Sequence, residues 1–397
     1  MKRLAYISAD LGVPVFGRKG CSIHVQEVLR SLTRQDAQVN LFTTSCEGEP
    51  SPGLEAVRLH ALPRPPKSDR AAREQAELAG NANLRRELEQ AAPFDFVYER
   101  YSLWSFAGME FARDAGIPGL LEVNSPLIDE QAEYRVLVDR GGAERAAECA
   151  FGAATALLAV SDEVGAYLER FPAARGKVHV VPNAVDPDRF PEGIKPALPA
   201  APGVFTVGFV GTLKAWHGLS FLIEAFALLH ARHSRTRLLI VGDGPELEKL
   251  VADVTVRGLA NATHFTGSVP SGEVAGLLAA MDVAVAPYPN LPQFYFSPLK
   301  VYEYMAGSLP VVASRVGQLE KLIEPDVNGL LVPPSNAPAL AAALERLCVE
   351  PELRQRLGRA GRTTVLGAHT WDKVAQRIFQ IAGLGQTHEP DKRAFTH

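Results

Sequence analysis

The sequence alternates short apolar runs with helical segments, and this alternation occurs in two series along the chain. In the first half the apolar runs are residues 4–8, 39–43, 96–99, 119–123, 156–160 and 178–181. Several of them are apolar nearly throughout, which is typical of parallel strands that are covered on both faces. Strands that alternate with helices predict βαβ units and parallel sheets. We therefore expect an α/β fold.

A proline-dense segment separates the two series. This linker, residues 182–203, has the sequence PNAVDPDRFPEGIKPALPAAPG. The second series has its apolar runs at 205–210, 237–241, 264–265, 283–286, 310–313 and 329–332. Domain boundaries fall in such linkers, and 397 residues exceed what one core usually holds. We predict two Rossmann-like domains facing across a cleft, residues 1–190 and 191–369, with a helix at about 370–385 that packs back on the first domain. Residues 386–397 are expected to be poorly ordered.

Composition excludes several classes of function. Lys plus Arg number 41 and Asp plus Glu number 45, so the net charge of −4 lacks the basic excess of nucleic-acid binders. The four cysteines have neither metal-ligand spacing nor a disulfide pattern, and such scattered cysteines fit a reducing compartment. No window approaches 18 uncharged apolar residues, so no transmembrane segment is predicted. We expect a cytoplasmic protein without a nucleic-acid partner, for which peripheral membrane association stays open.

The turns after the strands are the first place to look for chemistry, because ligands of parallel sheets bind beyond the carboxyl ends of the strands. In FGRKGCSIH, Gly17 and Gly20 precede a helix whose N-terminal amides suit an anion. Considered alone, this turn is explained equally well by glycines that only allow packing.

Two turns of the second half offer similar chemistry. GTLKAWHG places Gly211, Lys214 and His217 before a helix, and a lysine beside free amides suits a diphosphate. A solvated lysine and a helix-capping histidine explain the same residues. VGDGP, which contains Gly242, allows a tight bend near a ligand, and a structural turn explains it nearly as well.

The segment FYFSPLKVYEYMAGSLPVVAS, residues 294–314, is the most informative. Ser297 is predicted to cap a helix whose first turn contains Pro298. Lys300 and Glu303 then fall on roughly one face of that helix. Free amides and Lys300 would hold a diphosphate, while Glu303 would accept two vicinal hydroxyls such as those of a ribose. The alternative is an exposed Lys–Glu pair, and the burial of Glu303 distinguishes the two.

In their order along the chain, these stretches resemble a family-four retaining glycosyltransferase of the GT-B fold, of the SPLK-type subgroup. The matching stretches are residues 17–24, VPNAVD, GTLKAWHG, VGDGP, FTGSVP and SPLKVYEYMAGSLPVVAS. The resemblance implies transfer of a sugar from a nucleotide diphosphate sugar of the UDP or GDP type. The acceptor would be a hydroxyl of a glycan, a lipid-linked molecule or a small metabolite. The resemblance also implies retention, no metal and no cofactor, with the donor in the C-terminal domain and the acceptor in the N-terminal one.

The resemblance assigns roles residue by residue. Glu303 would bind the ribose, and Ser297, Pro298 and Leu299 would present main-chain groups to the diphosphate and sugar. The candidate donor-binding residues are Gly17, Gly20, Gly211, Thr212, His217, Gly242, Ser297, Pro298, Leu299 and Glu303. The candidate catalytic residues are Lys300, Lys214 and Asn124. Asn124 and His24, which is expected to begin the acceptor-domain helix, would face the acceptor.

Three positions depart from the family pattern. Tyr295 stands where the first glutamate of the E-x7-E pair is expected, and Asn124 matches a frequent acceptor-domain histidine only in a loose alignment. Thr212 and His217 occupy the places of the usual basic residues, which leaves Lys214 as the expected cation of that turn. Because no carboxylate nucleophile is evident, the resemblance favours attack of the acceptor from the face of the leaving diphosphate.

Other functions stay open at this point. The D-x-D string Asp186-Pro187-Asp188 lies in the linker, where turn formation explains it better than a metal site. No G-x-G-x-x-G follows the first strand, which argues against a nicotinamide dehydrogenase. A nucleotide-sugar epimerase or hydrolase on the same fold is the enzymatic alternative. The other alternative is an inactive nucleotide-sugar-binding partner subunit, which Tyr295 makes conceivable.

Overall fold

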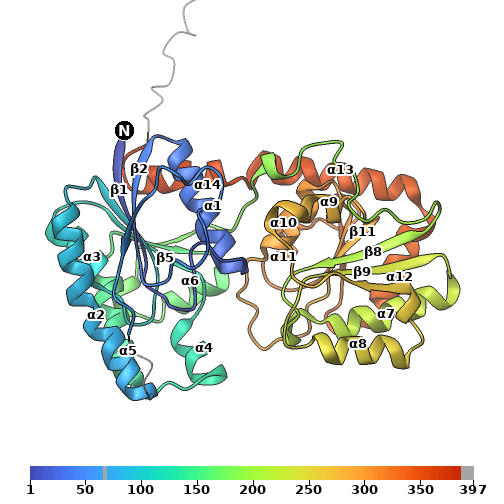
Figure 1. Cartoon of the computed structure of the whole chain (residues 1–397), viewed down its shortest axis with the longest axis horizontal. Coiled ribbons are helices and arrows are strands. Elements are labelled where there is room, and N and C mark those ends of the chain that lie inside the picture. Colours follow the sequence, from blue (N-terminus) through green and yellow to red (C-terminus); the bar gives the residue numbers. More distant parts are fainter. Residues whose placement is uncertain (66–68, 386–397) are drawn as a thin grey trace, which may run out of the picture.

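Two parallel α/β assemblies lie side by side in the computed structural model (Figure 1). The structure describes residues 1–65 and 69–385, and the tail predicted at 386–397 lies outside the described residues. Each assembly has a central sheet with helices on both faces, which is the arrangement that the apolar runs predict. The two-domain α/β fold predicted from the sequence is therefore confirmed.

The first sheet has seven parallel strands in the order β3-β2-β1-β4-β5-β6-β7. The strands are β1 (Lys2–Ser8), β2 (Ala37–Thr43), β3 (Arg58–Ala61), β4 (Phe96–Arg100), β5 (Gly119–Val123), β6 (Ala156–Ala159) and β7 (Val178–Val180). Its helices are α1 (Gly20–Arg34), α2 (Arg70–Ala91), α3 (Ala107–Asp114), α4 (Leu127–Tyr134), α5 (Arg140–Ala153) and α6 (Asp162–Leu168). All six predicted strands of this half are present. Only β3 was not predicted, because its exposed edge position leaves the sequence RLHA without an apolar run.

The second sheet has six parallel strands in the order β10-β9-β8-β11-β12-β13. The strands are β8 (Phe205–Val210), β9 (Thr236–Val241), β10 (Thr263–Phe265), β11 (Val283–Ala286), β12 (Val311–Ser314) and β13 (Leu330–Val332). Its helices are α7 (Leu219–Arg232), α8 (Leu247–Val256), α9 (Val274–Leu278), α10 (Leu299–Ala306), α11 (Leu319–Leu322), α12 (Ala337–Val349) and α13 (Pro351–Ala368). The strand order reverses between β1 and β4 in one sheet and between β8 and β11 in the other. Ligands of parallel sheets bind at such reversal points.

Strand β1 shows why the apolar runs are nearly continuous. Leu4 and Tyr6 belong to the core on one face of the sheet, and Ala5 and Ile7 belong to the core on the other face. All four side chains are fully buried. Because successive residues of a strand point to opposite faces, a strand with a core on each face favours apolar side chains at successive positions.

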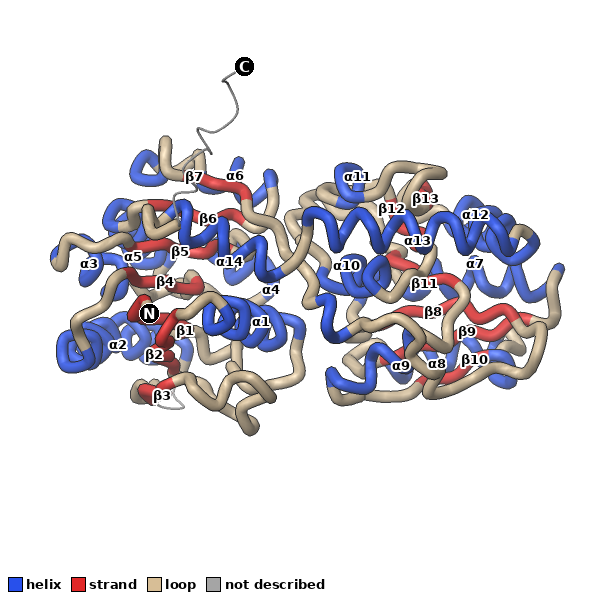
Figure 2. Tube along the Cα trace, turned by 90° about the horizontal axis from the view of Figure 1, so that it is seen from above, coloured by secondary structure: helices blue, strands red, loops and turns tan. Residues whose placement is uncertain are grey.

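The last helix, α14 (Trp371–Ile381), packs on the first sheet although the chain reaches it from the second (Figure 1). The rings of Trp371 and His24 lie 5.1 Å apart, and those of Phe379 and Phe96 lie 5.5 Å apart. Seen from above, α13 runs along one assembly and α14 along the other (Figure 2). The chain therefore passes between the assemblies twice, and an isolated bridge between Val185 and Thr370 joins the two passages.

Helix α2 is attached to the rest of the first assembly through two polar side chains. The buried carboxylate of Glu74 accepts the backbone N–H groups of Val138 and Asp139 at 3.1 and 2.9 Å. Asn81 accepts two N–H groups at the start of α3.

None of the helices in the described part of the chain has the length and apolar content needed to cross a membrane.

Candidate functional site

A cleft of about 950 Å³ lies between the two assemblies, where the carboxyl ends of both sheets face each other. Its volume falls in the range of small-molecule sites. The N-terminal wall includes the turn before α1, the end of β4 and the residue after β5, while the C-terminal wall includes the turns after β8 and β9 and the start of α10. Thirteen of the fourteen site residues predicted from the sequence line this cleft; the exception is Lys214.

Lys300 has the most unusual environment in the cleft. Its ammonium group is buried and has no hydrogen-bond partner among the described residues. The Nζ atom lies 4.2 Å from the centre of the Phe209 ring and 5.4 Å from that of Tyr288. Burial lowers the pKa of Lys300 to about 7, although the nearby Glu303 opposes this shift. A buried cation without a counter-ion is costly for a fold, and such groups are typical of ligand sites.

The start of α10 differs from the prediction. Ser297 does not cap the helix, because its hydroxyl accepts the N–H of Asn183 at 3.0 Å and its carbonyl accepts the Asn183 side-chain amide at 2.5 Å. Pro298 takes the N-cap position, and the helix begins at Leu299. Among the residues that the structure describes, no side chain caps α10, so the amides of its first two residues remain available beside Lys300. Ser297 thereby ties the start of the linker to this helix.

Glu303 does not form the exposed Lys–Glu pair that was the alternative. Its side chain is 15% exposed, and Oε1 lies 3.0 Å from Nη1 of Arg189 instead. Burial raises the pKa of Glu303, and the adjacent Arg189 guanidinium opposes the shift. The carboxylate therefore lines the cleft from a largely desolvated position.

The turn after β8 contains His217 and Lys214, of which Lys214 was the expected cation. His217 lines the cleft, donates from Nδ1 to the Thr212 carbonyl at 2.5 Å, and has its pKa lowered by burial to about 3. It is therefore neutral near pH 7. The Lys214 ammonium lies 4.4 Å from the Trp216 ring centre, and Lys214 is the predicted site residue that does not line the cleft.

The two glycines before α1 differ from each other. A Cβ atom at Gly17 would lie 2.9 Å from Pro14 Cγ and 3.0 Å from Ser22 Oγ, so close packing requires this glycine. Gly20 begins α1 without a positive φ, and a Cβ atom there would meet nothing within 4 Å. Neither a positive φ nor close packing against the described residues requires glycine at position 20.

On the N-terminal wall, His24 lies in the second turn of α1 and does not begin the helix, which starts at Gly20. Its Nε2 atom lies 2.6 Å from Oε1 of the buried Glu122. Burial would raise the pKa of Glu122, but His24 and Arg100 hold it below its usual value. Asn124 follows β5 and lines the same wall as His24.

Two families describe most of this chain. Residues 18–189 match the family described as Glycosyltransferase Family 4, and residues 204–350 match Glycosyl transferases group 1. A solved structure of sucrose-phosphate synthase from Thermosynechococcus elongatus superposes with a TM-score of 0.73 over 96% of this chain and 98% of that one, at 23% identity. The chain belongs to the family-four-like GT-B glycosyltransferases.

The relatives of this glycosyltransferase have varied functions. D-inositol 3-phosphate glycosyltransferase from Actinosynnema mirum is 28% identical over 98% of both chains. Alpha-D-kanosaminyltransferase from Streptomyces kanamyceticus is 34% identical, but the match covers 38% of each chain, and a glycogen synthase of Mycobacterium tuberculosis is matched over 52% of its length. A structure of Anabaena Alr3699/HepE in complex with UDP-glucose has a TM-score of 0.73 at 17% identity, covering 96% of this chain and 100% of that one.

Tyr295 of this glycosyltransferase does not line the cleft. Its hydroxyl donates to the carboxylate of Glu130 on α4, and its ring packs against the core of the first assembly. Glu130 also lines a second cavity, of about 170 Å³, beyond the ends of β1 and β4. Tyr295, which stands where the E-x7-E pair has its first glutamate, thus contributes a contact between the two assemblies.

Two cleft arginines escaped the sequence reasoning. Arg100 ends β4, where the strand order reverses, and its Nη1 atom has no hydrogen-bond partner in the described part of the chain. Arg100 directly follows the apolar run 96–99, so its place at the carboxyl end of a predicted strand could have identified it from the sequence. Arg189 lies in the linker, and the prolines of the linker predicted a domain boundary but no site residue.

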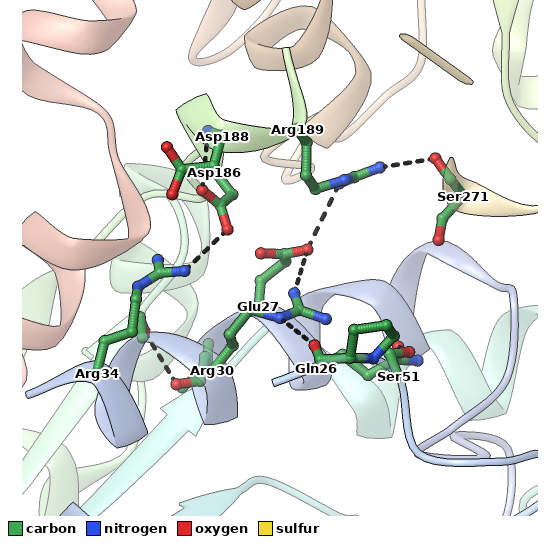
Figure 3. Close-up of polar contacts among 12 residues, drawn as sticks. Gln26, Glu27, Arg30, Arg34, Ser51, Asp186, Asp188, Arg189 and Ser271 are labelled. Atoms are coloured by element: carbon green, nitrogen blue, oxygen red, sulfur yellow. Dashed lines mark hydrogen bonds and ion pairs between the residues drawn. The ribbon is translucent and has the colours of Figure 1, made fainter. Parts of the chain in front are cut away.

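The D-x-D string forms a turn, as its place in the linker suggested. Asp186 accepts the N–H of Asp188 at 3.2 Å, and its other oxygen lies 3.0 Å from Arg34 (Figure 3). Within residues 1–65 and 69–385 there is no group of three or more His, Cys, Asp or Glu side chains suited to a metal ion.

Proposed function

We propose that this glycosyltransferase binds a nucleotide diphosphate sugar in the cleft and transfers the sugar, with retention, to a hydroxyl acceptor. The observation that carries the proposal is the buried ammonium of Lys300, which has no hydrogen-bond partner in the described part of the chain and lies beside a helix start, that of α10, that no described side chain caps. A diphosphate would supply the counter-ion that this ammonium lacks, and charge-assisted hydrogen bonds of this kind are about twice as strong as neutral ones. Glu303, on the same helix, would accept the ribose hydroxyls.

The charges of the cleft support an anionic donor. The cations among its lining residues are Arg18, Lys19, Arg100, Arg189 and Lys300, and the carboxylates are Glu47, Asp243 and Glu303. Five cations against three carboxylates leave an excess of two positive charges. UDP is the first nucleotide to test, because the Anabaena structure of the same fold contains UDP-glucose.

We assign the donor to residues 191–369 and the acceptor to residues 1–190. Glu303, Lys300 and the turns after β8 and β9 all lie on the C-terminal wall of the cleft, so the acceptor must approach from the opposite wall. Asn124 and His24 lie on that wall. A glycan, a lipid-linked molecule or a small metabolite would each present the hydroxyl that the reaction needs.

Retention follows from a same-face mechanism. The acceptor oxygen attacks the anomeric carbon from the face of the departing diphosphate, the bond from that carbon to the diphosphate oxygen breaks, and a diphosphate oxygen takes the acceptor proton. Lys300 and the first amides of α10 would stabilise the charge that grows on the diphosphate. The protein then contributes orientation and charge stabilisation and needs no general base.

Replacing Glu303 with alanine tests the donor site. The change should lower the affinity for UDP about ten- to a hundredfold, because charge-assisted hydrogen bonds contribute about 1.5–3 kcal/mol. Calorimetry on the folded variant measures the effect. Glu345→Ala is the control, because Glu345 forms its ion pairs with Arg232 and His233 and does not line the cleft. Equal UDP affinity in the wild type and Glu303→Ala would contradict the ribose role.

Transfer should survive excess EDTA. Lys300 and the free helix amides supply positive charge beside the proposed diphosphate position, so the reaction does not require a divalent cation there. The assay compares product formation with EDTA, with added Mn²⁺ and with neither. Loss of activity on chelation and its recovery with Mn²⁺ would contradict the proposal and direct attention to Asp186 and Asp188.

Product analysis distinguishes the transferase from its alternatives. A panel of UDP, GDP and ADP in a thermal-shift assay first identifies the nucleotide, because a ligand that binds the folded state raises the melting temperature. The matching nucleotide sugar is then incubated with and without acceptors. A glycosylated acceptor of unchanged anomeric configuration supports the proposal, whereas release or epimerisation of the sugar without any acceptor supports a hydrolase or epimerase.

A further inference from the structure

Arg189 lies between carboxylates that come from the two assemblies. It ends a short 3₁₀ turn (Pro187–Arg189) in the linker. Its Nη1 atom lies 3.0 Å from Oε1 of Glu303 on α10 and 3.5 Å from Oε1 of Glu27 on α1. Its Nη2 atom donates to the Ser271 carbonyl at 3.4 Å, and Figure 3 shows the side chain directed between Glu27 and Ser271.

The turn that carries Arg189 is itself fixed. Asp186 accepts the N–H of Asp188 and pairs with Arg34 at 3.0 Å, so the turn is attached to α1 (Figure 3). Phe190 is 2% exposed, and the Arg189 guanidinium lies 5.3 Å from the centre of its ring. Arg189 is therefore held in place by its neighbours rather than extended freely into solvent.

Glu27 is an unusual partner for Arg189. Its side chain is 4% exposed, Oε1 accepts from Arg30 at 2.8 Å, and Oε2 has no hydrogen-bond partner among the described residues. Burial raises the pKa of Glu27, and Arg30 and Arg189 oppose this shift. Arg189 thus compensates charge on two largely buried carboxylates at once.

These contacts matter for donor recognition because Glu303 must be ionised to accept two hydroxyl hydrogens. Protonation of one oxygen would turn an acceptor into a donor. With Oε1 held by Arg189, the remaining lone pairs of the carboxylate are directed to a ligand from a fixed position. We propose that Arg189 is a positioning residue that holds Glu303 ionised and oriented for the ribose and that connects this carboxylate, through Glu27, to the N-terminal assembly. This inference rests on the proposed role of Glu303 in donor binding.

The signs of the effects follow from the charges that face Glu303. Arg189 from the linker turn and Lys300 from the same helix lower its pKa, while Glu27 from α1 raises it, as does burial, the largest cause. UDP affinity should fall as the pH drops through the pKa of Glu303. Loss of Arg189 should move this fall to higher pH, and loss of the Glu27 charge should move it to lower pH.

The experiment measures UDP affinity by calorimetry between pH 5 and 8. In Arg189→Gln, the UDP affinity at pH 7 should fall about tenfold. The fall in affinity on the acidic side of the pH profile, which we call the acidic limb, should move to higher pH. Glu27→Gln should move the limb the opposite way. Arg232→Gln is the control, because Arg232 pairs with Glu345 and is not among the charges that shift the pKa of Glu27 or Glu303, so its fall in UDP affinity should stay at the wild-type pH. Arg189→Lys should restore part of the wild-type profile.

Two further measurements separate positioning from a general loss of structure. In the Glu303→Gln background, Arg189→Gln should have no additional effect on UDP affinity. The affinity for 2′,3′-dideoxyuridine diphosphate, which lacks the hydroxyls, should be nearly the same with and without Arg189. Wild-type UDP binding together with an unmoved acidic limb in Arg189→Gln would overturn this inference alone. If the wild type bound none of the nucleoside diphosphates in the panel, the proposed function would fail as well.

Discussion

Replacing Lys300 with methionine is expected to lower sugar transfer about 10²- to 10³-fold, which is the usual loss when one stabilising group is removed from a developing anion. The same change should raise the melting temperature of the ligand-free protein. The ammonium is buried without a partner among the described residues, so the unliganded fold carries its desolvation cost. Methionine retains much of the length of the side chain and removes the charge.

The pH dependence of this gain has a definite sign. Because the pKa of Lys300 in the folded protein is about 7 and its ordinary value is 10.5, the full cost of the buried charge is present below pH 7. The cost is relieved as the pH rises from about 7 toward 10.5. The stability difference between Lys300→Met and the wild type should therefore be larger at pH 6 than at pH 9.

Thermal unfolding without ligand and steady-state transfer kinetics test both outcomes. Lys321→Met is the control, because Lys321 is largely exposed and pairs with Asp162 at 2.6 Å, where a surface pair contributes little. A Lys300→Met protein with near wild-type transfer would contradict the assigned role. A lower melting temperature of Lys300→Met than of the wild type at pH 6 would contradict the claim that the buried ammonium destabilises the ligand-free protein.

Gly242→Ala is expected to lower the stability of the protein strongly. Gly242 has a φ of +134°, and a Cβ atom there would lie 2.0 Å from the carbonyl oxygen of Gly211. Neither backbone is free to move away, because Gly211 donates to Val241 and Gly242 donates to Gly267. An unfavourable φ and a backbone clash together should cost roughly 3–5 kcal/mol, or about 6–20 °C in melting temperature.

UDP binding should be lost together with stability, since Gly242 and Gly211 both line the cleft. Differential scanning calorimetry and UDP titration of the same sample measure the two effects. Gly258→Ala is the matched control, because Gly258 has a φ of +70° but open space around its Cβ position. That variant should lose only about 1–2 kcal/mol and keep its UDP affinity. Similar stability losses in both variants would show that the contact with Gly211 has little weight.

The strands were predictable because a core on each face of the sheet favours apolar residues at successive positions, as Leu4 to Ile7 show. Strand β3 was not predictable because its edge position exposes Arg58 and Leu59 and removes that selection. The contacts that attach α2 to the first assembly were not predictable for a different reason. Its buried Glu74 and Asn81 are polar because they bind backbone groups of distant segments, and no local sequence pattern records such contacts.

For the cleft, the sequence predicted most of the residues that we singled out as lining it, but not which of them form hydrogen bonds or ion pairs with neighbouring residues. Ser297 has the residue type of a helix cap, yet the linker residue Asn183 takes its hydroxyl. Lys214 was the expected cation of its turn, whereas the buried ammonium of Lys300 has no hydrogen-bond partner among the described residues. Arg189 contacts Glu303 across 114 residues of sequence, and a contact at that separation leaves no local signal.

The return of α14 to the first sheet has a consequence for synthesis on the ribosome. Trp371 and Phe379 of α14 belong to the same core as Leu4 and Tyr6, so one face of the first sheet stays incompletely covered until α14 has been translated. Domains usually fold in the order in which they are translated. Here the sequence of the second sheet is translated in full before α14 emerges, so the half that is made first is the half that finishes folding last.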